Sequence, residues 1–104
     1  MSLRDVFLGL QQRLDGQEVK GLNATFQFEL EGNEEGVYHI IFIEGSGKTG
    51  EGAVAAPNLT VTMNSDDFCS MLAGELNAAA AFMGGKLKVK GDMGLAMKLQ
   101  SFLS

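Results

Sequence analysis

The stretch Gly45-Ser-Gly-Lys-Thr-Gly50 contains residue types that bind nucleotide phosphates. A phosphate-binding P-loop requires a further glycine upstream and a helix directly after the lysine, whereas Phe42 and Ile43 stand upstream and no helical pattern follows. Glu44 would also repel a phosphate. The letters fit the dinucleotide pattern G-x-G-x-x-G, but its strand–turn–helix context is missing. We therefore interpret residues 45–50 as a flexible hairpin connection and predict that they bind no nucleotide.

His39 and Cys69 are the only histidine and the only cysteine of the chain. A metal ion requires several ligands, and the sequence offers no others at a suitable spacing, so we predict no metal site. A catalytic cysteine needs a base beside it, and the apolar helical surroundings of Cys69 favour a structural thiol. The acidic pairs at 66–67 and 34–35 are explained by a helix start and by a turn. We therefore predict that the protein has no catalytic residues, binds no cofactor and is not an enzyme.

The charge of the chain excludes one class of partner. Its 104 residues form one predicted domain, residues 1–104, with a net charge of −5. This balance argues against nucleic acid, which binds clustered Lys and Arg. Residues 81–104 differ, because they contain four lysines and one acidic residue. This basic segment is either a solvated strand face or a surface that attracts anionic lipid or acidic head groups.

Two absences indicate the compartment. A single cysteine cannot form an internal disulfide, which favours a reducing environment. No apolar run approaches the roughly 18 residues of a membrane span, and the amino terminus lacks the core of a signal peptide. We therefore predict a cytoplasmic location.

The periodicity of the apolar residues predicts an α+β fold. Alternation predicts strands at 24–31, 37–43 and 58–64, with shorter ones near 53–54 and 87–89. Helical spacing and caps predict helices at 3–15, 65–76, 78–83 and 93–103. The first four strands most simply form an antiparallel meander.

The strand at 37–43 is apolar on both faces. One face carries His39, Ile41 and Ile43, and the other carries Tyr38, Ile40 and Phe42. Either both faces are covered, or one face awaits a partner. The face with Tyr38 is therefore a candidate surface for a homodimer.

The last third of the chain is rich in phenylalanine and methionine that are spaced by alanine and glycine. In its final helix, Leu95, Leu99 and Phe102 already form an apolar face, and Met93 and Met97 widen it. Three helical segments of this kind must share one modest sheet. The pattern is typical of an ordinary core, and it also suits a cavity that adapts to an apolar ligand.

Two segments resemble the sterol carrier protein type-two domain family. They are Asn58-Leu-Thr-Val-Thr-Met-Asn-Ser-Asp-Asp-Phe68 and Ala81-Phe-Met-Gly-Gly-Lys-Leu-Lys-Val-Lys-Gly-Asp-Met-Gly-Leu-Ala-Met-Lys-Leu99. The order of the elements and the length also fit, so the resemblance extends over essentially the whole chain. It implies a five-stranded, mainly antiparallel sheet covered by helices, enclosing a hydrophobic tunnel. Gly84 stands where animal members carry glutamine, which removes a polar group near that tunnel.

The resemblance implies non-catalytic binding and carriage of long apolar lipids, namely fatty acids, fatty acyl-CoA or sterols. We predict that the ligand contacts apolar side chains of the sheet and of the C-terminal helices. They are Phe26, Phe28, Ile41, Phe68, Met71, Leu72, Phe82, Met83, Leu95, Leu99, Phe102 and Leu103, some of which must be plain core. The head group is expected near Asn23 or the strand Lys86–Lys90. The alternative is an accessory or dimerisation domain serving a lipid-metabolising enzyme. Either function allows transient contact with a membrane surface or with that enzyme.

Overall fold

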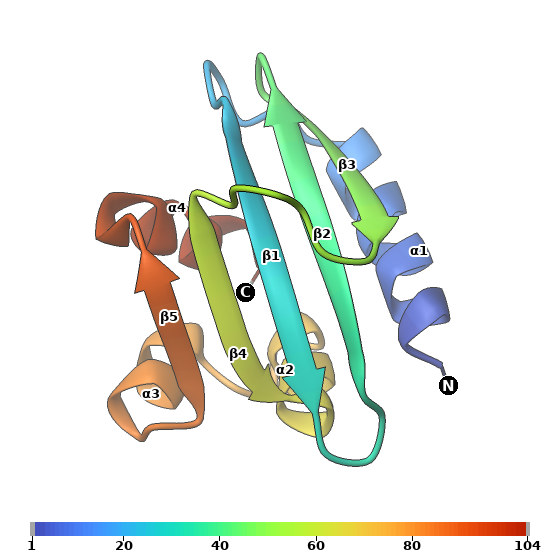
Figure 1. Cartoon of the computed structure of the whole chain (residues 1–104), viewed down its shortest axis with the longest axis vertical. Helices are drawn as coiled ribbons and strands as arrows, with labels where there is room; N and C mark the ends of the chain where they lie inside the picture. The colour runs from blue at the N-terminus through green and yellow to red at the C-terminus, as the bar shows by residue number, and fades with distance from the viewer. Residues whose placement is uncertain (1, 104) are drawn as a thin grey trace.

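The computed structural model describes residues 2–103, with side chains through Ser101 (Figure 1). Its elements, in chain order, are α1 (Leu3–Asp15), β1 (Ala24–Glu31), β2 (Gly36–Ile43), β3 (Ser46–Glu51), β4 (Leu59–Asn64), α2 (Ser65–Leu72), α3 (Ala78–Met83), β5 (Leu87–Gly91) and α4 (Met93–Leu103). The strands form one sheet in the order β3-β2-β1-β4-β5, with the helices behind it in Figure 1. No helix in this part of the chain is long and apolar enough to cross a membrane.

The pairing of the strands confirms a mainly antiparallel α+β fold. β1 with β2, β2 with β3 and β4 with β5 are antiparallel. The predicted simple meander is wrong at one junction, because β1 and β4 run parallel. After β3 the chain crosses the face of the sheet away from the helices, through residues 52–58, and reaches the free side of β1 (Figure 1). A parallel pair requires such a crossover, which local patterns do not reveal.

The glycine-rich stretch is a strand, so its interpretation as a flexible connection is wrong. β3 pairs with β2 from Ile43↔Ser46 to Tyr38↔Glu51, and no strand forms at 53–54. The two-residue turn between them has positive φ at Glu44 (51°) and Gly45 (85°), as type I′ hairpins require. Glycine is generally depleted in β-strands, and for this reason the sequence pattern did not predict a strand here.

Neighbouring side chains explain the glycines within β3. A Cβ atom on Gly47 would lie 2.8 Å from Cε2 of Phe42, and one on Gly50 would overlap the His39 ring. Glycine at positions 47 and 50 therefore leaves room for the Phe42 and His39 side chains of β2. The imidazole is half-buried, and its Nδ1 donates a hydrogen bond to the carbonyl of Gly52 at 2.8 Å.

The core lies between the sheet and the helices. The Phe7 ring of α1 stacks on Tyr38 at 4.3 Å between centroids and on Phe68 at 5.4 Å. Tyr38, Ile40 and Phe42 are all buried here. The prediction that this face of β2 is open to a second copy of the chain is therefore wrong, because α1 already covers it.

Side-chain caps define the N-terminal ends of these helices. The Ser2 hydroxyl accepts from the amide of Asp5 at 3.2 Å, and Asn64 Oδ1 accepts from Asp66 at 2.8 Å. Asp92 Oδ1 accepts from Gly94 at 2.9 Å. The second helix ends at Leu72 and not at residue 76, because the chain turns at 73–76. This turn leads directly into α3.

Candidate apolar binding site

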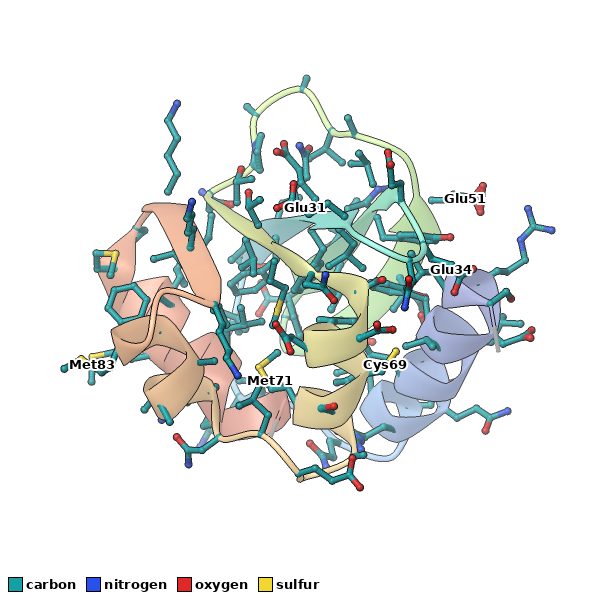
Figure 2. All side chains as sticks on the ribbon, turned by 90° about the horizontal axis from the view of Figure 1, so that it is seen from below. Glu31, Glu34, Glu51, Cys69, Met71 and Met83 are labelled. Atoms are coloured by element: carbon teal, nitrogen blue, oxygen red, sulfur yellow. The ribbon has the colours of Figure 1, made fainter. Side chains whose placement is uncertain are left out.

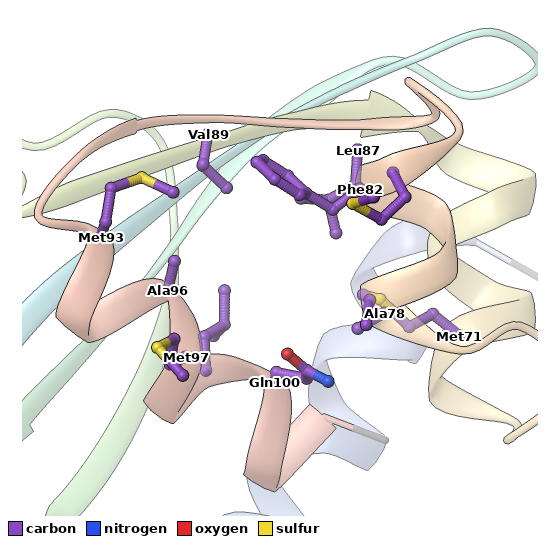
Figure 3. A pocket seen from close by; sticks show the side chains of 12 residues that line it. Met71, Ala78, Phe82, Leu87, Val89, Met93, Ala96, Met97 and Gln100 are labelled. Carbon is purple, nitrogen blue, oxygen red and sulfur yellow. The ribbon is translucent and has the colours of Figure 1, made fainter.

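An apolar pocket of about 180 Å³ lies between β5, α3 and α4 (Figure 3). Its lining residues are Met71, Ala78, Ala79, Phe82, Met83, Leu87, Val89, Met93, Ala96, Met97, Leu99 and Gln100. Gln100 is the single polar residue among them. The pocket opens to solvent, so the enclosed tunnel remains a prediction.

Strand alternation positions one wall of the pocket. β5 lies at the edge of the sheet and pairs with β4 in the register Val61↔Val89 and Met63↔Leu87. Leu87 and Val89 therefore face the helices and the pocket. The intervening Lys88 lies on the opposite face of the strand and is exposed.

The short helix α3 forms the second wall. The Asn77 side chain caps it by accepting from the amide of Ala80 at 3.1 Å. Ala78 and Ala81 are buried, which lets the helix pack closely against β5. Phe82 and Met83 at its C-terminal end are 44% and 83% exposed. They form part of the pocket's mouth.

Helix α4 forms the third wall. Leu99 is buried at the base of the pocket, together with Met71 of α2. Met93 and Met97 lie one turn apart on the same helix and are 51% and 74% exposed. We call Met83, Met93 and Met97 the rim methionines. The base is thus closed by packed side chains, while the mouth exposes flexible thioethers.

Among the residues that the structure describes, charged groups lie around the pocket and not inside it. Lys86, Lys88 and Lys90 are exposed on and beside β5. The two groups with a shifted pKa in the described part of the chain lie elsewhere. Burial raises the pKa of the Cys69 thiol, aided by the charges of Asp66 and Glu34. Burial, followed by the charge of Glu51, raises the pKa of Tyr38.

The structure brings four of the twelve predicted ligand residues together around the pocket: Met71, Phe82, Met83 and Leu99. The others lie elsewhere. Phe26, Phe28 and Phe68 are buried in the core, and Leu72 and Leu95 pack against it. Ile41 pairs with Thr25 and lies on the sheet face opposite to the helices. The side chains of Phe102 and Leu103 lie outside the described residues.

Several pocket residues were not among the predicted ones. Met93 and Met97 were recognised as widening an apolar face but were not assigned to the site. The alternation of Leu87 and Val89 could have indicated a wall, whereas nothing in the sequence pointed to Gln100. Of the two head-group candidates, Lys86–Lys90 adjoins the pocket. Asn23 does not line it, and its side chain accepts from the amide of Glu44 at 2.9 Å.

Comparison with known proteins identifies the family. Residues 7–104 match the SCP-2 sterol transfer family. The chain belongs to this family. The match covers all three walls of the pocket.

Solved structures of SCP-2 proteins share this fold. The crystal structure of sterol carrier protein 2 like 2 from Aedes aegypti superimposes with a TM-score of 0.83 at 22% sequence identity, covering 97% of this chain and 95% of that one. The solution structure of a palmitated sterol carrier protein from the same species has a TM-score of 0.79 at 24% identity, covering 99% and 95%. At these identities the likeness establishes the fold alone.

Curated relatives are longer proteins. Hydroxysteroid dehydrogenase-like protein 2 from Xenopus laevis is 36% identical over 102 residues, which are 97% of this chain and 24% of that protein. The chain thus spans about a quarter of the length of the curated relatives it matches. In those relatives the SCP-2 region is one part of a larger chain.

Proposed function

We propose that the domain binds a long apolar lipid reversibly, without catalysis, in the pocket between α3, β5 and α4. The observation that carries the proposal is a lining with one polar residue, which opens through exposed Phe82 and the rim methionines. Proteins rarely expose such a cluster unless it contacts a ligand or a partner. Membership of a sterol transfer family supports the same function.

The size of the pocket limits how the ligand fits. A cavity of about 180 Å³ is close to the roughly 150 Å³ that accommodates benzene, so it receives only part of a long chain. Burial of about 16 methylenes would contribute roughly 13 kcal/mol, and the costs of association reduce this by several kcal/mol. We therefore propose that the ligand separates α3 from α4. The short α3 and the turn at Gly84-Gly85 favour this movement.

An apolar lining selects ligands by their length and bulk and not by their chemical identity. Burial of apolar surface is non-directional, so fatty acids, fatty acyl-CoA and sterols all remain candidates. An acidic head group at the mouth would lie at the same edge of the sheet as Lys86, Lys88 and Lys90. The same lysines favour weak attraction to an anionic membrane surface. A free Cys69 supports a reducing compartment such as the cytoplasm.

Two neighbouring alanines of α3 provide a matched test. Ala79 and Ala80 are both exposed, but only Ala79 lines the pocket. Ala79→Phe should weaken binding of a fluorescent palmitate analogue at least tenfold, because the ring occupies the ligand's space. Ala80→Phe should change the Kd less than twofold. Failure of the unmodified protein to bind any acyl ligand, or equal effects of the two variants, would contradict the proposed site.

The relatives favour a second function. Because hydroxysteroid dehydrogenase-like proteins contain this region, we propose that the domain also presents lipids to a lipid-metabolising enzyme. In a full-length protein of this kind, Ala79→Phe should raise KM for an apolar substrate and leave turnover of a water-soluble substrate unchanged. Equal KM values for the apolar substrate would exclude the accessory function.

A further inference from the structure

Thioether sulfur is concentrated at the mouth of the pocket. Of the six methionines in the chain, Met83, Met93 and Met97 are exposed at the rim and Met71 is buried at the base. Figure 3 shows the sulfurs of Met93 and Met97 beside the opening, and Figure 2 shows Met83 extending away from the body of the molecule. We propose that the rim methionines are a site of oxidation by hydrogen peroxide, and that this modification lowers the affinity of the pocket for its lipid. The inference rests on the proposed function.

The modification is a two-electron oxidation of each thioether. A lone pair of Sδ attacks one oxygen of hydrogen peroxide, so that an S–O bond forms while the O–O bond breaks. The departing hydroxide takes the remaining proton and leaves as water. The sulfur is oxidised to a sulfoxide and the peroxide is reduced, and no other reactant is needed.

Exposure directs the oxidant to the rim. The buried residues Met63 and Met71 are 2% and 0% exposed, so peroxide reaches them only when the structure opens. Cys69 is a poor competitor, since burial raises the pKa of its thiol and the thiolate is the reactive form. The three rim sulfurs should therefore react before the other sulfur groups among the described residues.

A sulfoxide changes what the mouth does to a lipid. Each rim sulfoxide would place a strong hydrogen-bond acceptor where an apolar chain removes water, and the chain offers no donor in return. In the reduced state Gln100 is the only polar side chain among the described residues that line the pocket. Three sulfoxides would thus make the mouth polar, and enzymatic reduction of the sulfoxides would reverse the change.

The test compares each protein with its own untreated form. After mild treatment with hydrogen peroxide, peptide mass spectrometry should locate the added oxygen at Met83, Met93 and Met97 before Met63 and Met71. The Kd for a fluorescent palmitate analogue should rise at least tenfold, while circular dichroism stays native. Methionine sulfoxide reductases should restore the original Kd.

Two variants make the test specific. In the triple variant Met83→Leu, Met93→Leu, Met97→Leu, peroxide should change the Kd less than twofold, because leucine has a similar volume and no sulfur. In Met63→Leu the loss of affinity on oxidation should persist. If oxidation unfolds the protein, Met97→Gln, which is polar without an oxidant, provides a second measurement and should itself raise the Kd.

The outcomes separate the two proposals. Absence of binding by the reduced protein would overturn the proposed function. Normal binding by the reduced protein, with unchanged Kd after full oxidation of the rim methionines, would overturn only this inference. Equal oxidation of Met71 and the rim, a peroxide effect that survives in the triple variant, or an unchanged Kd in Met97→Gln would also overturn it.

Discussion

At the scale of single residues, Cys69 links burial to proton binding. Its thiol is half-buried on α2, and burial raises its pKa above the ordinary value of 9.0. The nearby charges of Asp66 and Glu34 act in the same direction. The folded state therefore holds this proton more tightly than the unfolded chain does.

The first prediction concerns alkaline pH. Because the pKa is raised on folding, the contribution of Cys69 to stability is fully present below pH 9.0 and is lost as the pH rises through the folded value. The free energy of unfolding in urea should fall across this window, and Cys69→Ala should make the fall less steep. A steeper or identical slope in the variant would contradict the assignment. Asp66→Asn should lower the pKa of the thiol and accelerate its alkylation.

At the scale of elements, the side chain of Gln11 in α1 protects the open edge of β3. Its Nε2 donates to the carbonyl of Gly47 at 3.0 Å, and its Oε1 accepts from the amide of Thr49 at 2.6 Å. One amide side chain thus replaces the backbone of a missing neighbouring strand. Edge strands without such protection tend to pair with other chains.

The second prediction tests this contact. Gln11→Ala should lower the free energy of unfolding by about 1–3 kcal/mol, since two backbone groups lose their partner. The adjacent and exposed Gln12 is the matched control, and Gln12→Ala should stay within about 0.5 kcal/mol of the parent protein. Urea titration gives both values. Equal losses would show that helix propensity, and not the edge contact, is being measured.

Local chemistry explains which elements were predictable from the sequence. Ser2, Asn64 and Asp92 are caps whose hydrogen bonds depend on their immediate neighbours, so the helix starts were predicted correctly. The sequence did not predict β3, because its glycines are required by large side chains of β2 that are distant in local pattern and lie against them only in the folded sheet. The parallel pairing of β4 depends on the route of the crossing segment, which is a tertiary property.

The candidate site was predictable to a smaller extent. Alternation identifies the helix-covered face of the sheet, but it does not tell where that face is filled and where a gap remains. Phe28 and Val89 illustrate this, because both lie on this face while only Val89 lines the pocket. The contrast depends on Phe7 and Phe68, which pack around Phe28 from other elements.

At the scale of the whole molecule, charge is distributed unevenly. The chain carries a net charge of −5, yet lysines gather beside the pocket on β5. Figure 2 shows Glu34 and Glu51 on the side of α1, and Met83 on the opposite side. The β5 lysines and the apolar mouth therefore lie at the same edge of the sheet, on opposite faces of the strand, and this edge would orient toward an anionic surface.

The third prediction tests this orientation with two double variants that lose the same charge. Each lysine close to an anionic surface contributes about 1 kcal/mol to membrane binding. Replacing Lys88 and Lys90 by glutamine should therefore lower the partition coefficient onto phosphatidylserine vesicles, measured by sedimentation, by roughly tenfold or more. Replacing Lys20 and Lys48, away from the pocket, should have a much smaller effect. Binding should also weaken with added salt. Equal losses in both variants would indicate that only total charge matters.

All the described lining residues of the pocket lie in one continuous segment, Met71 to Gln100. The sheet joins this segment to the rest of the molecule through the pairing of β4 with β1. The aromatic cluster around Phe7 belongs mainly to the other part of the chain. Local unfolding of α3 and α4 would therefore leave that cluster and strands β1 to β3 intact. Amide protons of α3 should then exchange with solvent much earlier than those of β1. Such a small subglobal opening would admit the proposed lipid without global unfolding.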